Sequence, residues 1–194
     1  IIFGSPKTFE IHPVEPVNLP DRVTHYMLIN FKNKIVAGPK MNRKIYLKFP
    51  IEAGVFVAGS KEWGLLDVFS LEAQKYTLYG SPRGGVVCRH YKSPVFDERP
   101  ENDPIKEGIL ELQIKNNSGL WVELRKVVID ARGMKIYFNG AAAAMRARME
   151  IESRTQAHTE FLDAPLEKGM KQARELFTGR KVKVASQRFV MESG

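Results

Sequence analysis

The sequence predicts a mainly β protein, an antiparallel sandwich-like fold with one short helix near the C-terminus. Apolar and polar residues alternate along most segments, most clearly over residues 145–152, as they do on a half-buried strand. Clusters of proline and glycine separate these segments at short spacing, and only residues 163–179 show helical spacing. Because 194 residues with 43% hydrophobic content can bury one large core, we expect a single β-rich domain over residues 1–194. Two packed β subdomains are the alternative.

Short strands interrupted by proline are expected in the first fifty residues. They span residues 8–12, 23–31 and 45–49, and Asn33 with Lys34 should form a turn. Since proline lacks the backbone donor, this part should lie at sheet margins. The strand over 23–31 is apolar on both faces, so we expect it in the core.

The middle of the chain predicts further strands over residues 51–58, 63–69 and 75–79. Residues 80–85 combine proline with three glycines, which is typical of a reversal, and 86–91 should return as a hairpin strand. In that strand Cys88 should point inward and Arg89 outward, with Tyr91 next to Tyr79.

Residues 94–107 form the longest polar, proline-rich connection, and we expect an acidic linker or the seam between two subdomains there. The spacing in this segment is not that of a calcium loop and the glycine of such a loop is missing, so we expect no metal at Asp97, Glu98, Glu101 and Asp103.

A second hairpin is expected from residues 110–114, a turn at 116–119 and a return over 121–129. The apolar phase changes within the return strand, which predicts a bulge near Arg125 and Lys126. A strand over residues 134–138 and one long strand over 143–161 should follow.

The helix is expected to begin at Asp163 and to end at Thr178 and Gly179. Its apolar residues, spaced four, three and four apart, are Leu166, Met170, Ala173 and Phe177. A final strand over residues 180–190 should complete the fold.

The net charge of +8 is concentrated in the terminal segments. Residues 1–50 and 131–194 each carry +5, whereas 51–130 carry −2. This distribution would suit nucleic acid if both ends met on one face. However, basic and acidic residues are interleaved around Arg146 and Arg148, so we interpret the charge first as favouring solubility.

The residues give no catalytic or cofactor motif, and we expect neither a cofactor nor an enzyme. The four histidines are far apart in sequence, and the phosphate-binding and nucleophile-elbow motifs are missing. Cys88 and His90 share a strand face but lie roughly 7 Å apart, too far for direct proton transfer. A single cysteine and no long apolar segment predict a cytoplasmic protein without a membrane span.

A ligand-binding patch is predicted on the hairpin around residues 79–91. Its residues combine aromatic rings with cationic side chains: Tyr79, Arg83, Arg89, His90 and Tyr91. This mixture suits an anion, a sugar or an acidic protein surface. Cross-strand pairing for stability explains the tyrosines equally well.

The chain also resembles an archaeal protein family known only as a domain of unknown function. The resemblance rests on residues 50–55, 67–69, 75–80 and 85–91, which are strand and turn motifs. It implies an archaeal, cytoplasmic protein and transfers no catalytic residue. We therefore expect a non-catalytic module that binds a ligand or another protein. A nucleic-acid binder, an enzyme assembled from distant residues, and a homodimer formed through an exposed edge remain alternatives.

Overall fold

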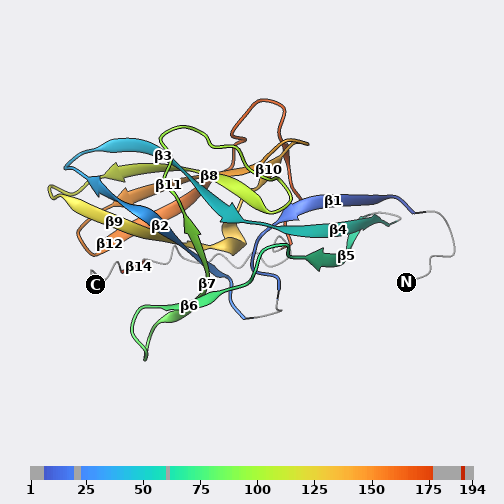
Figure 1. Ribbon diagram of the computed structural model, residues 1–194, viewed down its shortest axis with the longest axis horizontal. Helices are drawn as coiled ribbons and strands as arrows, with labels where there is room; N and C mark the ends of the chain where they lie inside the picture. Colours follow the sequence, from blue (N-terminus) through green and yellow to red (C-terminus); the bar gives the residue numbers. More distant parts are fainter. Residues whose placement is uncertain (1–6, 20–22, 60–61, 177–188, 191–194) are drawn as a thin grey trace.

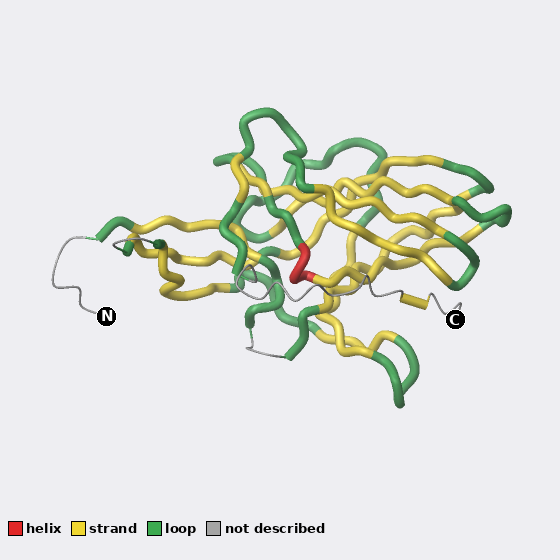
Figure 2. Tube along the Cα trace, turned by 180° about the vertical axis from the view of Figure 1, so that it is seen from behind, coloured by secondary structure: helices red, strands yellow, loops and turns green. Residues whose placement is uncertain are grey.

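The computed structural model describes residues 7–19, 23–59, 62–176 and 189–190. Over these residues the chain is mainly β, which confirms the predicted fold class, and its strands form three sheets (Figure 1). The only helix in the described part is a single 3₁₀ turn, Ala131–Gly133 (Figure 2). We name the sheets A, B and C.

Sheet B has the strand order β6-β7-β2-β9. Its strands are β6 (Tyr76–Tyr79), β7 (Val86–Ser93), β2 (Tyr26–Ala37) and β9 (Val122–Asp130). The β6 and β7 strands form the expected hairpin, whereas β2 and β7 run parallel. The strand predicted for the core, β2, therefore lies between two partners.

Sheet C is built around β11 (Ala143–Ile151). On one side β11 pairs in parallel with β8, which also pairs with β3; on the other side it pairs with β12 and, at its start, with β10. The remaining strands of sheet C are β3 (Asn42–Pro50), β8 (Glu107–Asn116), β10 (Tyr137–Phe138), β12 (Gln156–Leu162), β13 (Lys171–Gln172) and β14 (Phe189–Val190).

Sheets B and C pack face to face as a sandwich. The main core joins Met27 and Ile29 of sheet B to Leu47, Leu112 and other residues of sheet C, all almost fully buried. Sheet A projects from one end of this sandwich (Figure 1). It has the antiparallel order β1-β4-β5, formed by β1 (Phe9–Val14), β4 (Glu52–Ala58) and β5 (Trp63–Phe69).

The predicted turn at Asn33 and Lys34 is wrong, because β2 continues through both residues to Ala37. Four residues, Phe31 to Lys34, lie opposite the single residue Arg125 of β9. The irregularity predicted near Arg125 and Lys126 does occur, but the extra residues belong to β2. The change of apolar phase along β9 therefore reflects the extra residues in β2, its partner strand.

The predicted hairpin over residues 110–129 is also wrong, because β8 lies in sheet C and β9 in sheet B. Asn116 holds the connection between the sheets. Its buried side-chain amide donates to the carbonyl oxygens of Ala37, Gly38 and Leu120, at 2.9 to 3.0 Å. The turn residues therefore mark an arch between two layers.

The predicted long strand over residues 143–161 is two strands. The chain reverses after Ile151, and β12 returns antiparallel along β11. The backbone amides of Glu152 and Ser153 both donate to the carbonyl oxygen of Gln156 and close the turn. The predicted strand over 134–138 is shorter, since only Tyr137 and Phe138 pair.

The predicted helix is wrong over the described residues 163–176, which form turns and the short strand β13. Gly169 has a φ of +91°, which an α-helix does not accommodate. Leu166 and Met170 pack instead on Tyr46 and Ile109, on the outer side of sheet C. The rest of that prediction, and residues 180–188 of the final strand, lie outside the described residues; Phe189–Val190 pairs with β12.

Candidate functional site on the projecting sheet

The structure separates the five residues predicted to bind a ligand. Arg89 is 1% exposed, so the expectation that it faces solvent is wrong. His90 shares a 2.9 Å hydrogen bond with the Asn30 side chain, and the Tyr91 hydroxyl donates to Glu107. Arg83 is exposed in the turn of the hairpin. The binding role of the set stays a prediction.

Tyr79 and Cys88 pack on the outer face of sheet B. Tyr79 lies against a small buried cluster that contains Cys88 and Leu28, and the Lys126 ammonium lies 5.1 Å from its ring centroid. Cys88 is buried, as predicted, but it lies on the outer face of sheet B and not on the face toward the main core, where the prediction placed it. Burial raises the pKa of its thiol to about 11, so the sulfur stays protonated and unreactive at neutral pH.

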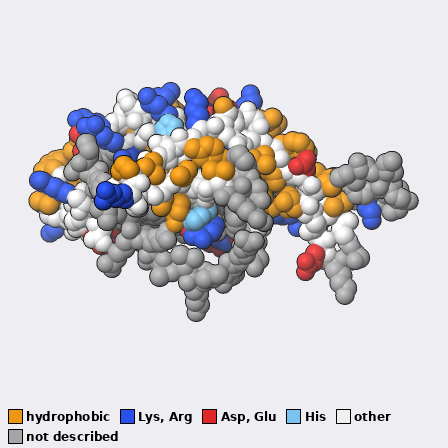
Figure 3. All heavy atoms as spheres, turned by 90° about the horizontal axis from the view of Figure 1, so that it is seen from below, with side chains coloured by type: hydrophobic (Ala, Val, Ile, Leu, Met, Phe, Trp, Pro, Cys, Tyr) orange, Lys and Arg blue, Asp and Glu red, His pale blue; other side chains and the backbone are white. Residues whose placement is uncertain are grey.

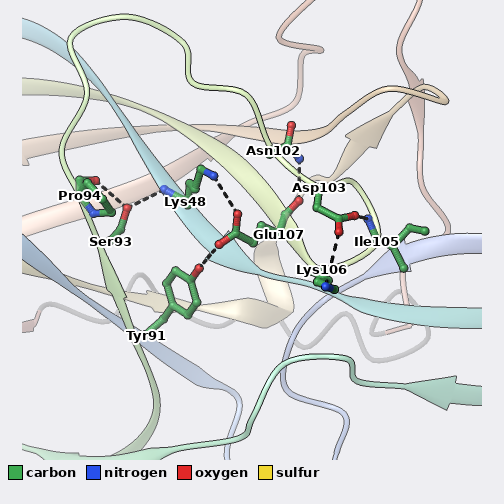
Figure 4. Close-up of polar contacts among 9 residues, drawn as sticks. All are labelled: Lys48, Tyr91, Ser93, Pro94, Asn102, Asp103, Ile105, Lys106 and Glu107. Atoms are coloured by element: carbon green, nitrogen blue, oxygen red, sulfur yellow. Dashed lines mark hydrogen bonds and ion pairs between the residues drawn. The ribbon is translucent and has the colours of Figure 1, made fainter.

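A polar cluster beside Tyr91 was not found from the sequence (Figure 4). Glu107 accepts hydrogen bonds from the Tyr91 hydroxyl at 2.5 Å and from the Lys48 ammonium at 2.9 Å. The Ser93 hydroxyl accepts one from the backbone amide of Lys48 at 2.7 Å. These residues come from β7, β3 and β8, so the cluster joins the two layers of the sandwich. No local sequence motif predicts this polar cluster, because its residues are distant in sequence.

The charges of this cluster are mutually satisfied. Burial alone would raise the pKa of Glu107, but hydrogen bonds from Tyr91 and Lys48 outweigh it, and the net pKa is lowered. An open depression of about 670 Å³ lies beside Lys48 and is lined by residues 95–101. The Lys48 ammonium is already paired with Glu107, so it contributes little free positive charge for binding a ligand in this depression.

Arg89 anchors sheet A to the sandwich. Its guanidinium on β7 donates to Glu52 at the start of β4, to the Pro16 carbonyl oxygen and to the Ser70 hydroxyl. The second carboxylate oxygen of Glu52 accepts from the Asn18 backbone amide at 3.0 Å. Each hydrogen bond that Arg89 donates crosses from the sandwich to sheet A or its flanking segments, so these charge-assisted bonds hold the junction in place.

Arg174 forms a second anchor on the inner face of sheet A. Its guanidinium lies 4.5 Å from the Trp63 ring centroid and donates to Glu10 at 2.8 Å. Its backbone amide donates to His12 Nδ1, and the His12 ring packs beside Phe138 of sheet C. The inner face of sheet A is therefore anchored around Arg174 and His12, although Leu65 on the same face is 47% exposed.

The outer face of sheet A is apolar and open. Directly paired residues share a face, and the pairs Phe9 with Val57, Ile11 with Val55, and Phe69 with Ala53 all lie on this one. Ile11 is 67% exposed and Phe69 50%. Figure 3 shows hydrophobic side chains exposed at this end of the molecule. We call this surface the outer face of sheet A.

Sheet A is also the acidic part of a basic protein. The strands β1, β4 and β5 contain Glu10, Glu52 and Asp67 and neither lysine nor arginine. Glu10 and Glu52 are paired with arginines, whereas Asp67, opposite Val55, is exposed on the outer face. An apolar surface with one carboxylate is thus presented on a fixed scaffold.

Comparison with known families covers nearly the whole chain. The model of a protein family of unknown function, DUF432, matches residues 1–192. The chain belongs to the DUF432 family. This confirms the resemblance to a family of unknown function, and no activity comes with the DUF432 description. Neither the curated proteins nor the solved structures contain a match to the chain.

Two further observations concern the described part of this DUF432 protein. No three side chains among its His, Cys, Asp and Glu residues come together in a way that could hold a metal ion. No helix there is long and apolar enough to cross a membrane.

Proposed function

We propose that this chain is a non-catalytic protein-binding module and that the outer face of sheet A is its docking surface. The observation that carries the proposal is the exposure of Ile11 and Phe69 on one face of a sheet whose other face is anchored. Contiguous exposed apolar area on a rigid element is typical of a protein interaction site.

The charge of sheet A indicates which kind of partner surface would fit it. Within the described strands β1, β4 and β5, Asp67 is the only charged side chain on the outer face, in a protein of net charge +8. A complementary surface would be apolar at its centre and would place a lysine or arginine opposite Asp67. In a dimer joined through this face, the strands of the second sheet A would offer Asp67 neither a lysine nor an arginine, so we favour a different protein over a homodimer.

The chemistry of the thiol supports a cytoplasmic location as part of this proposal. The only cysteine, Cys88, is buried and cannot form an intrachain disulfide. An archaeal origin, which the resemblance implied, stays a prediction that the distribution of the family among genomes would check.

The proposal is tested by site-specific photo-crosslinking. A photoreactive phenylalanine analogue would replace Ile11 or Phe69 in the full chain, and crosslinked partners would be identified by mass spectrometry in a lysate of the native organism. The matched control is the same replacement at Ile105, which is 58% exposed on the 94–107 segment. We expect one shared partner from positions 11 and 69 and none from position 105.

The substitution Asp67→Lys should abolish this crosslink, because it would place like charges opposite each other. A partner captured equally from position 105, or one unaffected by Asp67→Lys, would overturn the proposal. The mass of the pure protein, measured by sedimentation over a range of concentrations, identifies self-association; a homodimer lost on Asp67→Lys would replace the proposed partner with a second copy.

A further inference from the structure

Trp121 lies at the end of the sandwich opposite to sheet A, immediately before β9, and is 68% exposed. One side of its indole ring rests on Gly38. A Cβ placed on Gly38 would lie 3.1 to 3.2 Å from two ring carbons, so the ring contacts the backbone where a side chain is missing. The ring is therefore held against one strand end while most of its surface faces solvent.

The loop that carries Trp121 is fixed in place. Asn116 donates to the carbonyl oxygens of Gly38 and of Leu120, the residue that precedes Trp121. The Asn116 side-chain amide thus holds both Gly38 and the backbone that leads into Trp121. Little conformational entropy would be lost if a second flat ring stacked on the exposed indole.

Cationic side chains lie on the adjacent strands β2 and β9 near Trp121. Lys34 and Arg125 are 59% and 66% exposed, and both donate to the single carboxylate of Glu123. Lys40 is exposed in the turn that follows Gly38. Figure 3 shows lysine and arginine side chains grouped at this end. Among these four residues, three are cations and one is a carboxylate.

The outer face of sheet C also carries paired charges, but neither of the two tryptophans lies on it, since Trp63 is on β5. Arg146 lies 2.9 Å from Glu111, and Arg148 lies 3.4 Å from Glu160. Neighbouring opposite charges of this kind cancel the potential that a polyanion would encounter. Paired charges occur on both surfaces, so the exposed indole is what favours the Trp121 end.

We propose that Trp121, with Lys34, Lys40 and Arg125, binds single-stranded nucleic acid. A base would stack on the exposed side of the indole, and the flanking phosphates would lie near the three cations. Single strands are favoured over duplexes because only unpaired bases offer their faces for stacking. This site is separate from the outer face of sheet A and does not depend on the function proposed for it.

Intrinsic fluorescence tests the site directly, because the chain has two tryptophans. In a Trp63→Phe variant Trp121 is the only indole, and we expect a 15-residue oligothymidylate to quench it at about 50 mM salt. Affinity, measured in the wild-type chain by anisotropy of a labelled oligothymidylate, should fall steeply as salt rises. Trp121→Ala should weaken binding by at least about fivefold.

Charge variants distinguish binding at the Trp121 site from non-specific electrostatic attraction of nucleic acid to a basic protein. Glu123→Gln removes the carboxylate shared by Lys34 and Arg125 and should tighten binding, whereas Arg125→Gln should weaken it. The matched control is Lys171→Gln, an exposed cation on β13, which should leave affinity nearly unchanged. Equal binding by the Trp121→Ala chain, a preference for the duplex of equal length, or equal losses from Lys171→Gln and Arg125→Gln would overturn the proposal.

Discussion

Arg89 and Glu52 form an ion pair in which neither side chain is more than 1% exposed, at the junction of sheet A with the sandwich. Burial raises the pKa of Glu52, and the Arg89 guanidinium counteracts part of that rise. Because each charge is removed from water, each depends on the other and on the polar groups around them. The orientation of the proposed docking surface depends on this contact.

Arg89→Met is expected to lower the free energy of unfolding by about 3 to 5 kcal/mol, because it leaves the Glu52 carboxylate buried without a counter-charge. Urea denaturation at pH 7 measures the change. The double variant Arg89→Met with Glu52→Gln should recover part of it. Arg125→Met is the matched control, since Arg125 pairs with Glu123 at the surface and should cost at most about 1 kcal/mol. Equal losses in the two single variants would show that the buried pair does not stabilise the junction.

Stability should decrease as pH rises from about 4.5 to 7 because of Glu15. Burial raises the pKa of this carboxyl from 4.5 to about 7, and the Glu175 and Glu52 carboxylates add to the shift, while backbone amides of Glu15 and Leu176 oppose it. The folded chain thus holds a proton that the unfolded chain releases, and folding loses this advantage as pH rises. Glu15→Gln should be more stable than wild type at pH 8 and similar at pH 4.5 when unfolding is measured at both. A constant difference between the two proteins at all pH values would contradict this assignment.

Asn116→Asp should destabilise the fold by roughly 1 to 3 kcal/mol. The substitution removes the amide donor that serves three carbonyl oxygens and places a carboxylate next to them. Thermal unfolding of this variant should be compared with that of Asn117→Asp, whose side chain is exposed. If the neighbouring variants unfold at the same temperature, Asn116 does not hold the arch.

Gly108→Ala tests the packing between β8 and β3. A Cβ at Gly108 would overlap the ring of Phe49, which is fully buried and cannot move freely. We expect a loss of about 1 to 3 kcal/mol in the free energy of unfolding. Gly119→Ala is the control, because no atom lies within 4 Å of its added methyl group. A Gly108→Ala chain as stable as the control would mean that the core can readjust around Phe49.

The sequence predicted individual strands better than their partners. Residues 63–69 and the turn after Tyr79 were located correctly, since alternation and turn residues are local properties. The partners of β8 and β9 were not, because nothing local distinguishes a hairpin turn from an arch. Arg89 was expected outside because alternation describes one sheet, and sheet A covers the face on which it lies. Of the stripe from Leu166 to Ala173, Ala173 joins the main core while Leu166 and Met170 pack on the outer side of sheet C, and the positive φ of Gly169 is incompatible with a helix there.

The topology also sets an order of events during synthesis. The described partners of β2 in sheet B, β7 and β9, are encoded far downstream of it, and β8 likewise precedes its parallel neighbour β11. A nascent chain that has emerged only as far as β6 therefore carries the strand of the central core without either neighbour. Until residues through 130 have emerged, β2 lacks at least one of its two neighbours in sheet B, and its free edge is open to pairing with another chain.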